Sequence, residues 1–224
     1  MKKAMVYGAG VSGLAACELL RKNGYEVILV DDKKGLSSKE AMTQLDGVEI
    51  FIKSPGIPYN ELVLEVKNKE IELIDEIELA YRYSVGKFKI IAVTGTNGKT
   101  TTTTLLIKLL SADTKIRKSF ESNTIHAITT GILKGDGDLG VFEYGIRNKS
   151  YGIPDTVQRL IDPVGVVYTT ISREHSQVAG VKNPFEEYVD AKSLLSQGMT
   201  RGVVISNADD PVTANIACNK RNDL

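Results

Sequence analysis

The residues that point most directly to chemistry lie in one loop, which reads Thr-Gly-Thr-Asn-Gly-Lys-Thr-Thr over 94–101. A short apolar run, 90–93, precedes the loop, and a segment rich in threonine and leucine follows it. A glycine-bearing loop between a strand and a helix binds phosphates, because its backbone N–H groups and the positive end of the helix face the same anion. We therefore expect a triphosphate to lie against Gly95, Thr96, Asn97, Gly98, Lys99, Thr100 and Thr101.

Two side chains of this loop have distinct expected roles. Lys99 would contact the outer phosphate oxygens, and the hydroxyl of Thr100 would bind Mg²⁺. The loop departs from the full G-x-x-x-x-G-K-[ST] pattern, because Val93 stands at its first glycine. The alternative is therefore a polar turn that only caps an ordinary helix.

A second glycine motif, Gly-Ala-Gly-Val-Ser-Gly, occupies 8–13 and follows the apolar run 4–7. A helix and a second strand, 26–30, come next, and that strand ends in Asp31 and Asp32 about twenty residues after the glycines. This order predicts a Rossmann-like nucleotide-binding unit, with tight packing of the helix on the strand as the simpler alternative. The acidic residues can hold the ribose of NAD or of another nucleoside, so the motif leaves the nucleotide open.

The elements that position both loops alternate between strand and helix patterns. The helix over 102–110 should bury the side that carries Leu105, Leu106, Leu109 and Leu110. The alternation predicts an α/β protein with a Rossmann-like domain over 1–87 and a P-loop-type parallel-sheet ATPase domain over 88–224. Further strands are expected over 48–52, 71–74, 139–145 and 164–169, a strand and turn over 203–211, and helices over 59–69, 75–80 and 184–195.

The composition limits the kinds of partner that the protein is expected to bind. Lysine plus arginine and aspartate plus glutamate each number 28, so no basic excess indicates nucleic acid or an acidic membrane surface. The two cysteines, Cys17 and Cys218, lie too far apart for a metal-type spacing, which fits a reducing compartment. No signal-like or membrane-length apolar run is present. We expect a cytoplasmic, monomeric protein with no nucleic-acid or membrane partner.

The loop at 94–101 resembles the ATP loop of the Mur ligases, which join an amino acid to a carboxylate during the synthesis of cell-wall peptides, and of the related folylpolyglutamate synthases. The resemblance covers essentially all 224 residues and includes, in order, the glycine motif, Asp31, Ser54-Pro-Gly-Ile and Ile74-Asp-Glu-Ile-Glu-Leu. It implies ATP and Mg²⁺ as cofactors. The implied partners are a UDP-linked sugar or peptide substrate and a free amino acid.

In the family members that add D-glutamate, the first domain binds the UDP of the substrate and uses no nicotinamide. The resemblance implies backbone contacts to the diphosphate from Val11 and Ser12, and contacts to the uridine and ribose from Asp31 and Asp32. The family commonly has threonine at one of the two acidic positions. The implied UDP-binding residues of this unit are Gly8, Gly10, Val11, Ser12, Gly13, Asp31, Asp32, Ser54 and Gly56.

The second unit carries matches at single positions. Glu143 resembles the strand-end glutamate that binds Mg²⁺ in the family, and His175 resembles the histidine near a second Mg²⁺. Lys192 resembles a helix lysine that is carbamylated into an oxygen ligand, and Asn123 matches a loop that touches the sugar substrate. The resemblance thus implies Thr100, Glu143, His175 and Lys192 as metal ligands, and Lys99, His175 and Lys192 as catalytic residues.

Each of these residues has a simpler alternative. Glu143 can be a solvated glutamate, His175 a structural histidine and Lys192 an exposed helix lysine. His126 is interpreted as a helix-face or surface histidine, with a metal ligand as the alternative. The prediction is therefore spatial: Glu143, His175 and Lys192 must converge beside the phosphate loop.

The implied reaction transfers the γ-phosphoryl group of ATP to the substrate carboxylate, and an amine then displaces phosphate to form an amide. An NAD-dependent oxidoreductase would explain 8–32 but leave the phosphate loop without a role. A regulatory ATP-binding module without catalysis is the third alternative.

The branch of the family is open at this point. The first unit resembles the D-glutamate-adding members, whereas Ser172-Arg-Glu-His is closer to the tripeptide-forming members, and several departures are compatible with the pseudomurein ligases of archaea. The chain ends at Leu224, before a later ATP-side motif and the C-terminal domain of the family. We therefore expect a truncated second domain and no turnover by residues 1–224 alone.

Overall fold

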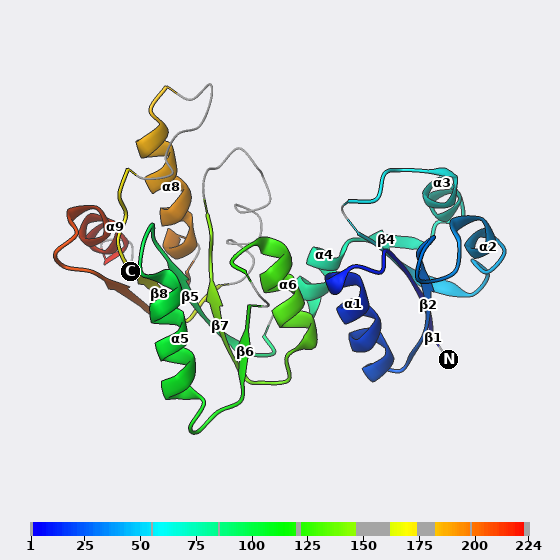
Figure 1. Cartoon of the computed structure of the whole chain (residues 1–224), viewed down its shortest axis with the longest axis horizontal. Coiled ribbons are helices and arrows are strands. Elements are labelled where there is room, and N and C mark those ends of the chain that lie inside the picture. Colours follow the sequence, from blue (N-terminus) through cyan, green and yellow to red (C-terminus); the bar gives the residue numbers. More distant parts are fainter. Residues whose placement is uncertain are drawn as a thin grey trace. The chain divides into compact units, whose positions relative to one another are not determined.

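The computed structural model describes residues 2–54, 56–84, 86–119, 122–146, 162–173, 182–197 and 199–221. These residues form two compact units, Met1–Tyr83 and Ser84–Leu224, coloured blue to cyan and green to red in Figure 1. Each unit is a parallel sheet with helices packed against it, so the predicted α/β class with a Rossmann-like first domain and a P-loop-type second domain is confirmed. None of the described helices is both long and apolar enough to cross a bilayer.

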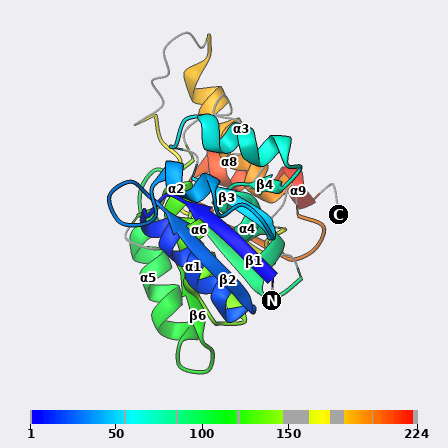
Figure 2. The ribbon, with the colours of Figure 1, turned by 90° about the vertical axis from the view of Figure 1, so that its right-hand side faces the viewer.

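The first unit has four parallel strands in the order β2-β1-β3-β4, with β1 between β2 and β3 (Figure 2). Its strands read as continuous apolar runs because both faces of a parallel sheet are covered. The strands are β1 (Lys2–Tyr7), β2 (Tyr25–Val30), β3 (Val48–Lys53) and β4 (Glu72–Ile74). The helices are α1 (Val11–Lys22), α2 (Ser38–Met42), α3 (Glu61–Asn68) and α4 (Glu76–Ser84).

The second unit has five parallel strands in the order β6-β7-β5-β8-β9. The strands are β5 (Lys89–Thr94), β6 (Ile116–Lys118), β7 (Leu139–Glu143), β8 (Gly165–Tyr168) and β9 (Val203–Ser206). The helices are α5 (Lys99–Leu110), α6 (Ile125–Lys134), α8 (Pro184–Gln197) and α9 (Pro211–Arg221). The sequence did not predict α2 or α9.

Each glycine loop follows a strand that has a neighbouring strand on both sides in its sheet. In the first unit β1 is flanked by β2 and β3, and in the second β5 is flanked by β7 and β8. A crevice opens outside the carboxyl ends of the strands at such a position, and ligands of open α/β sheets bind there. The topology thus places each loop at the expected ligand edge of its own sheet.

Helices α5 and α6 cover opposite faces of the second sheet. A Cβ on Gly131 of α6 would lie 3.0 Å from the ring of Phe142, whereas the next residue, Glu143, bonds to Thr100 of α5. Because successive strand residues point to opposite faces, the two helices lie on the two sides of β7. Glu143 therefore belongs to the face that carries the phosphate loop and α5.

The buried side of α5 differs from the prediction. Leu105 and Leu109 are 55% and 72% exposed, whereas Thr103 is 7% exposed. The face of the helix that packs toward the sheet carries Thr103 and the half-buried Leu106 and Leu110. Apolar content alone therefore indicated the wrong face, whereas the Thr100 hydroxyl at the N-terminus of the helix bonds to Glu143 of the sheet.

Asp210 joins α9 to the segment that follows β8. It is 7% exposed; its Oδ1 accepts from the N–H of Val212 at 2.9 Å, and its Oδ2 accepts from the N–H of Ile171 at 2.6 Å. The first bond caps the helix, and the second satisfies a buried amide of the loop. The turn over 203–211 therefore has a structural role.

We expect Asp210→Ala to lower the free energy of unfolding of the second unit by about 2–3 kcal/mol, because it removes a helix cap and leaves a buried N–H unsatisfied. Urea unfolding followed by circular dichroism measures this loss. The matched control is Asp209→Ala at the exposed neighbouring position, which should cost less than about 0.5 kcal/mol. Equal losses in the two variants would contradict the role given to Asp210.

Candidate active site

The phosphate loop of the second unit depends on two glycines with positive φ. Gly95 has φ +150°, and a Cβ there would collide with Thr169 and the backbone of Thr170. Gly98 has φ +82° and is the N-cap of α5. Residues with a Cβ atom are strained at such positive φ values, so both positions require glycine. The loop is thus a shaped backbone turn at a helix N-terminus, and the alternative of a simple capping turn does not explain Gly95.

The segment after β8 holds the loop in place. The N–H of Thr96 donates to the carbonyl of Thr170 at 2.5 Å, and the Thr169 hydroxyl donates to the carbonyl of Asn97 at 2.6 Å. The first bond within α5 runs from the N–H of Thr102 to the carbonyl of Gly98 at 3.0 Å. The N–H groups of 99–101 precede that bond and lie at the positive end of the helix. This arrangement is suited to an anion.

Lys99 folds over the same loop. Its Nζ donates to the carbonyl of Thr96 at 2.9 Å, and the side chain is half-buried. The Lys99 ammonium is therefore held against the backbone of the phosphate loop.

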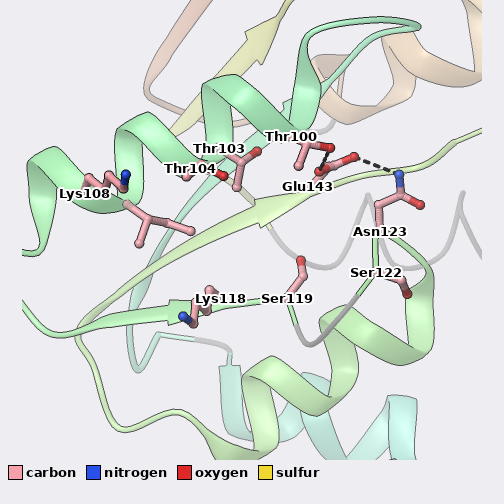
Figure 3. A pocket seen from close by; sticks show the side chains of 10 residues that line it. Thr100, Thr103, Thr104, Lys108, Lys118, Ser119, Ser122, Asn123 and Glu143 are labelled. Carbon is pink, nitrogen blue, oxygen red and sulfur yellow. Dashed lines mark hydrogen bonds between the residues drawn. The ribbon is translucent and has the colours of Figure 1, made fainter.

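Glu143 lies at the carboxyl end of β7 between two donors. The Thr100 hydroxyl donates to its Oε2 at 2.8 Å, and the Asn123 Nδ2 donates to its Oε1 at 2.8 Å; Figure 3 shows the three side chains directed toward one another. Gly145 lets Asn123 approach, since a Cβ at Gly145 would lie 2.5 Å from the Asn123 Oδ1. The glutamate is thus an oriented, half-buried carboxylate rather than a solvated one.

This carboxylate and the neighbouring hydroxyl suit Mg²⁺. The described part of the chain contains no group of three or more His, Cys, Asp or Glu side chains that could hold a metal. Mg²⁺, however, commonly takes one or two protein oxygens and completes its shell with phosphate oxygens and water. Thr100 and Glu143, 2.8 Å apart beside the phosphate loop, fit that pattern.

Lys192 reaches the other side of the loop from α8. It is 1% exposed, which rules out the alternative of an exposed helix lysine. Its Nζ donates to the carbonyl of Gly95 at 3.1 Å and to the carbonyl of Ile146 at 2.9 Å, and it lies 4.4 Å from the ring centre of Tyr188. The amine is therefore fixed by backbone oxygens from the loop and from the segment after β7.

The structure thus brings two of the three predicted residues to the loop: Glu143 contacts Thr100, and Lys192 contacts Gly95. His175 lies outside the described residues. His126 is exposed on α6, as expected. Sequence reasoning missed the contact between Tyr188 and Thr96, whose hydroxyls lie 3.1 Å apart.

The first unit has its own glycine loop, in which Gly8 has φ +118° and a Cβ on it would collide with Ser54. Gly13 packs against the carbonyl of Gly8, so the close packing of helix and strand is real. Val11 is 51% exposed at the start of α1. Gly10 and Gly56 both face open space. The tight-packing alternative and an accessible loop are therefore both present.

Glu76 links the two loops of this unit. It is 1% exposed, and its Oε1 accepts from the hydroxyls of Ser12 at 3.2 Å and Ser54 at 2.5 Å. Because both hydroxyl protons go to this carboxylate, any contact of Ser12 with a diphosphate would use the backbone N–H, as the resemblance implied. The sequence does not indicate this role of Glu76, since an acidic residue in the first turn of a helix is common.

Asp31 closes the strand end onto the glycine loop. Its Oδ2 accepts from the N–H of Ala9 at 2.9 Å, and its Oδ1 accepts from the N–H groups of Lys33 and Lys34 at 3.0 Å each. These bonds, led by the one from Ala9, hold the pKa of Asp31 below its ordinary value. Asp32 makes one such bond, accepting from the N–H of Ser38 at 3.2 Å.

Comparisons with known proteins follow the same two units. Residues 93–223 match the model of the Mur ligase middle domain, and residues 6–50 match that of an NAD(P)-binding Rossmann-like domain. The chain belongs to the Mur ligase family. It is 57% identical over 214 residues to the UDP-N-acetylmuramoylalanine–D-glutamate ligase of Fusobacterium nucleatum, covering 94% of this chain and 48% of the relative. The corresponding enzyme of Elusimicrobium minutum is 34% identical over 232 residues, covering 93% and 48%.

Solved structures of Mur ligases share the fold. A pseudomurein peptide ligase type C from Methanothermus fervidus superposes with a TM-score of 0.71 at 25% identity, covering 96% of this chain and 46% of that one. MurF from Thermotoga maritima in complex with ADP gives a TM-score of 0.58 at 16% identity, covering 87% and 45%. This Mur ligase chain spans about half the length of the curated relatives that it matches.

Thr96 offers a test of the packing around the phosphate loop in this Mur ligase chain. We expect Thr96→Val to lower the free energy of unfolding of the second unit by about 2 kcal/mol, because the buried Thr96 hydroxyl accepts from the N–H of Ser172 at 3.0 Å. Thr96→Ser keeps that acceptor and should lose less than half as much. Urea unfolding of both variants measures these losses, and equal losses would contradict the role given to the hydrogen bond from Ser172.

Asp31 gives the first unit a pH-dependent stability. Because its folded pKa lies below the unfolded value of about 3.9, its contribution is full above that pH and is lost as the pH falls through the folded pKa. We expect Asp31→Asn to destabilise the unit at pH 7 and to approach the stability of the original protein as the pH falls below the folded pKa of Asp31. Urea unfolding followed through NMR signals of the first unit tests this, with Asp32→Asn as control. A difference independent of pH would contradict the assignment.

Proposed function

We propose that the whole protein is an ATP-dependent ligase that joins an amino acid to the carboxylate of a UDP-linked cell-wall precursor through an acyl phosphate. The observation that carries this proposal is the contact of Thr100, Glu143 and Asn123 beside a phosphate loop whose two glycines adopt positive φ. The similarity to D-glutamate ligases favours UDP-N-acetylmuramoyl-L-alanine and D-glutamate as the substrates. The lower identity to the pseudomurein ligase disfavours the archaeal alternative.

In this proposal the second unit binds the triphosphate. The N–H groups at the start of α5 bind its oxygens, and the Lys99 ammonium moves from the Thr96 carbonyl to the outer phosphate. Gly95, Asn97, Gly98 and Thr101 shape the rest of the cradle. Adenosine triphosphate is the proposed nucleotide.

Thr100 and Glu143 are the proposed Mg²⁺ ligands, and Asn123 orients the carboxylate while remaining close enough to touch the acceptor. Bound Mg²⁺ would offset the negative charge that builds up on the phosphoryl oxygens. His175 stays a predicted ligand. No residue of the chain needs to form a covalent intermediate, because the substrate carboxylate itself attacks the γ-phosphorus.

Lys192 is proposed to become a carbamate. Its Nζ now donates to two carbonyl oxygens, and a carbamate nitrogen keeps only one N–H, so the modification requires that one of these bonds be exchanged. Electron density at high CO₂ concentration tests this proposal. An unmodified amine in a nucleotide complex that contains Mg²⁺ would contradict it.

The first unit is the proposed UDP site. The backbone of Val11 and Ser12 at the positive end of α1 suits a diphosphate, and Gly8, Gly10 and Gly13 allow its approach. Ser54 and Gly56 form the adjoining wall. Asp31 and Asp32 remain the proposed contacts to ribose and uracil, since each oxygen that accepts a backbone bond keeps a second lone pair.

A nicotinamide cofactor is the second candidate for this unit, because residues 6–50 match an NAD(P)-binding model. A fluorescence titration with NADH against UDP distinguishes the two. Tight binding of NADH that UDP does not displace would favour an oxidoreductase. The cytoplasmic location and the monomeric state stay predictions.

The activity test uses the full-length protein with ATP, Mg²⁺, UDP-N-acetylmuramoyl-L-alanine and D-glutamate, and measures phosphate release. We expect release that requires both the acid and the amine. Glu143→Gln should lower kcat by about 100-fold or more, because the amide is neutral and turns a donor toward the metal or Asn123. The control is Arg201→Gln, at an exposed position two residues before β9, which should leave kcat unchanged.

Phosphate release that does not depend on the amine, or no release at all, would favour a regulatory ATP-binding module. Residues 1–224 alone should bind ATP without turnover, since they span about half the length of the relatives. Amide product formed by residues 1–224 alone would contradict that expectation.

A further inference from the structure

A pocket of about 620 Å³ lies in the first unit, at the carboxyl ends of β3 and β4 and beside α3 and α4. Its volume is within the range of small-molecule sites. The described residues that line it are Lys53, Tyr59, Lys67, Leu73, Ile74, Asp75 and Glu78. None of these described residues belongs to the glycine loop or to the proposed contacts of UDP, so the proposed function leaves the pocket without a role.

The pocket lies on the face of the sheet that α3 covers. Phe51 of β3 packs in one apolar cluster with side chains of α3. Lys53 follows Phe51 by two residues and projects to the same face, because side chains alternate along a strand. Ser54 comes next and directs its hydroxyl to Glu76, the residue that also binds the glycine loop. The Lys53 side chain and the proposed UDP contact of Ser54 therefore point to opposite faces.

A lysine and an aspartate stand side by side at these strand ends without forming an ion pair. Lys53 and Asp75 directly precede and follow no charged partner in the ladder; each comes straight after the last paired residue of its strand. The Lys53 Nζ donates to two backbone carbonyls of the next loop, at 3.0 and 2.5 Å, and the Asp75 Oδ1 accepts from the N–H of Glu78 at 2.7 Å. An ammonium has three N–H donors, so Lys53 keeps one, and the Asp75 Oδ2 accepts from no described residue. Both charges are therefore available to a ligand.

Tyr59 brings a second cation to the same pocket. The centre of its ring lies 4.5 Å from the Nζ of Lys67 and 5.4 Å from the Nζ of Lys53, and the residue is 62% exposed. The face of the ring attracts both ammonium groups, whereas the two like charges repel each other. Neither lysine makes an ion pair with a described residue. A carboxylate between them would offset the repulsion and accept two charge-assisted hydrogen bonds.

The pocket also contains negative charge and apolar surface. Glu78 already accepts from the Nε of Arg82 at 2.8 Å, so Asp75 carries the carboxylate charge that no described cation offsets. The half-buried Leu73 adds an apolar side chain to the lining. Two cations, one unpaired carboxylate and an apolar surface are the complement of a small zwitterion with an apolar side chain.

We propose that this pocket binds a free α-amino acid with an apolar side chain. The carboxylate of the amino acid lies between the ammonium groups of Lys53 and Lys67, and its ammonium group bonds to Asp75. Its side chain packs against Leu73 and the ring of Tyr59. The proposal goes beyond the proposed ligase function and does not rest on it.

The test uses residues 1–224 with L-leucine as probe, calorimetry for affinity and amide NMR shifts for location. N-acetyl-L-leucine lacks the ammonium group and L-leucinamide lacks the carboxylate, so each should bind at least about tenfold more weakly than leucine. The expected shifts lie at 53, 59, 67 and 75. Absence of leucine binding, shifts confined to other residues, or equal binding of either analogue overturns the proposal.

Variants test the two charges of the site separately. Asp75→Asn keeps a side-chain acceptor for the N–H of Glu78 but removes the charge, and it should weaken leucine about tenfold. Lys67→Gln removes an exposed cation, and it should weaken leucine about threefold and flatten its salt dependence. The matched control is Lys69→Gln at the C-cap of α3, which pairs with Asp46 and should leave the affinity unchanged. Unchanged affinity in Asp75→Asn overturns the proposal; if that variant fails to fold, unchanged affinity in Lys67→Gln does so.

UDP separates this pocket from the proposed nucleotide site of the same unit. The affinity for leucine should be the same with and without excess UDP, and displacement of leucine by UDP overturns a separate site. Leucine binding that the pocket variants weaken, together with no binding of UDP, supports the pocket and counts against the proposed UDP site. UDP binding without leucine binding rejects only the pocket, so the two proposals fail separately.

Discussion

The backbone bond between Thr96 and Thr170 is the contact on which the second unit depends. It joins the phosphate loop after β5 to the segment after β8, two stretches that only the parallel sheet brings together. Thr169 crosses the same gap to Asn97, and Asp210 anchors the segment from behind through Ile171. A loop with positive φ at two glycines is not self-supporting, so its shape comes from this neighbouring segment.

Charges of opposite sign lie beside the phosphate loop. The start of α5 and Lys99 provide positive charge above the turn, while Glu143 provides the negative charge that a cation needs. Lys192 lies beneath the loop, where carbonyl oxygens of Gly95 and Ile146 replace the water it has lost. The amine thereby ties α8 to both β5 and β7. In the proposed function these opposite charges serve phosphate binding and metal binding, respectively.

The first unit uses a buried carboxylate for a similar purpose. Glu76 receives the hydroxyls of Ser12 and Ser54, so the glycine loop and the loop after β3 keep a fixed distance. Asp31 then closes the loop from the β2 side through Ala9. In both units the loops at the carboxyl ends of the strands support one another, which explains why residues far apart in the chain act on the same site.

Much of this organisation could be predicted from the sequence. Apolar runs of strand length, glycines at turn positions and the spacing from the glycines to Asp31 are local properties, so they indicated two parallel α/β units and both loops. The approach of Glu143 and Lys192 to the phosphate loop was predicted only through resemblance to a family, since no local pattern states which strand ends are neighbours.

The tertiary structure alone decided the features that depend on rotation and contact. The leucines of α5 indicated one buried face, but the helix buries Thr103 and exposes Leu109. The tertiary structure also left the buried Thr103 hydroxyl without a hydrogen-bond partner among the described residues, and it brought the Tyr188 hydroxyl within 3.1 Å of that of Thr96. A sequence determines which elements form, because propensity and periodicity act over a few residues; the geometry between elements is decided by packing across the sheet, which no short stretch contains.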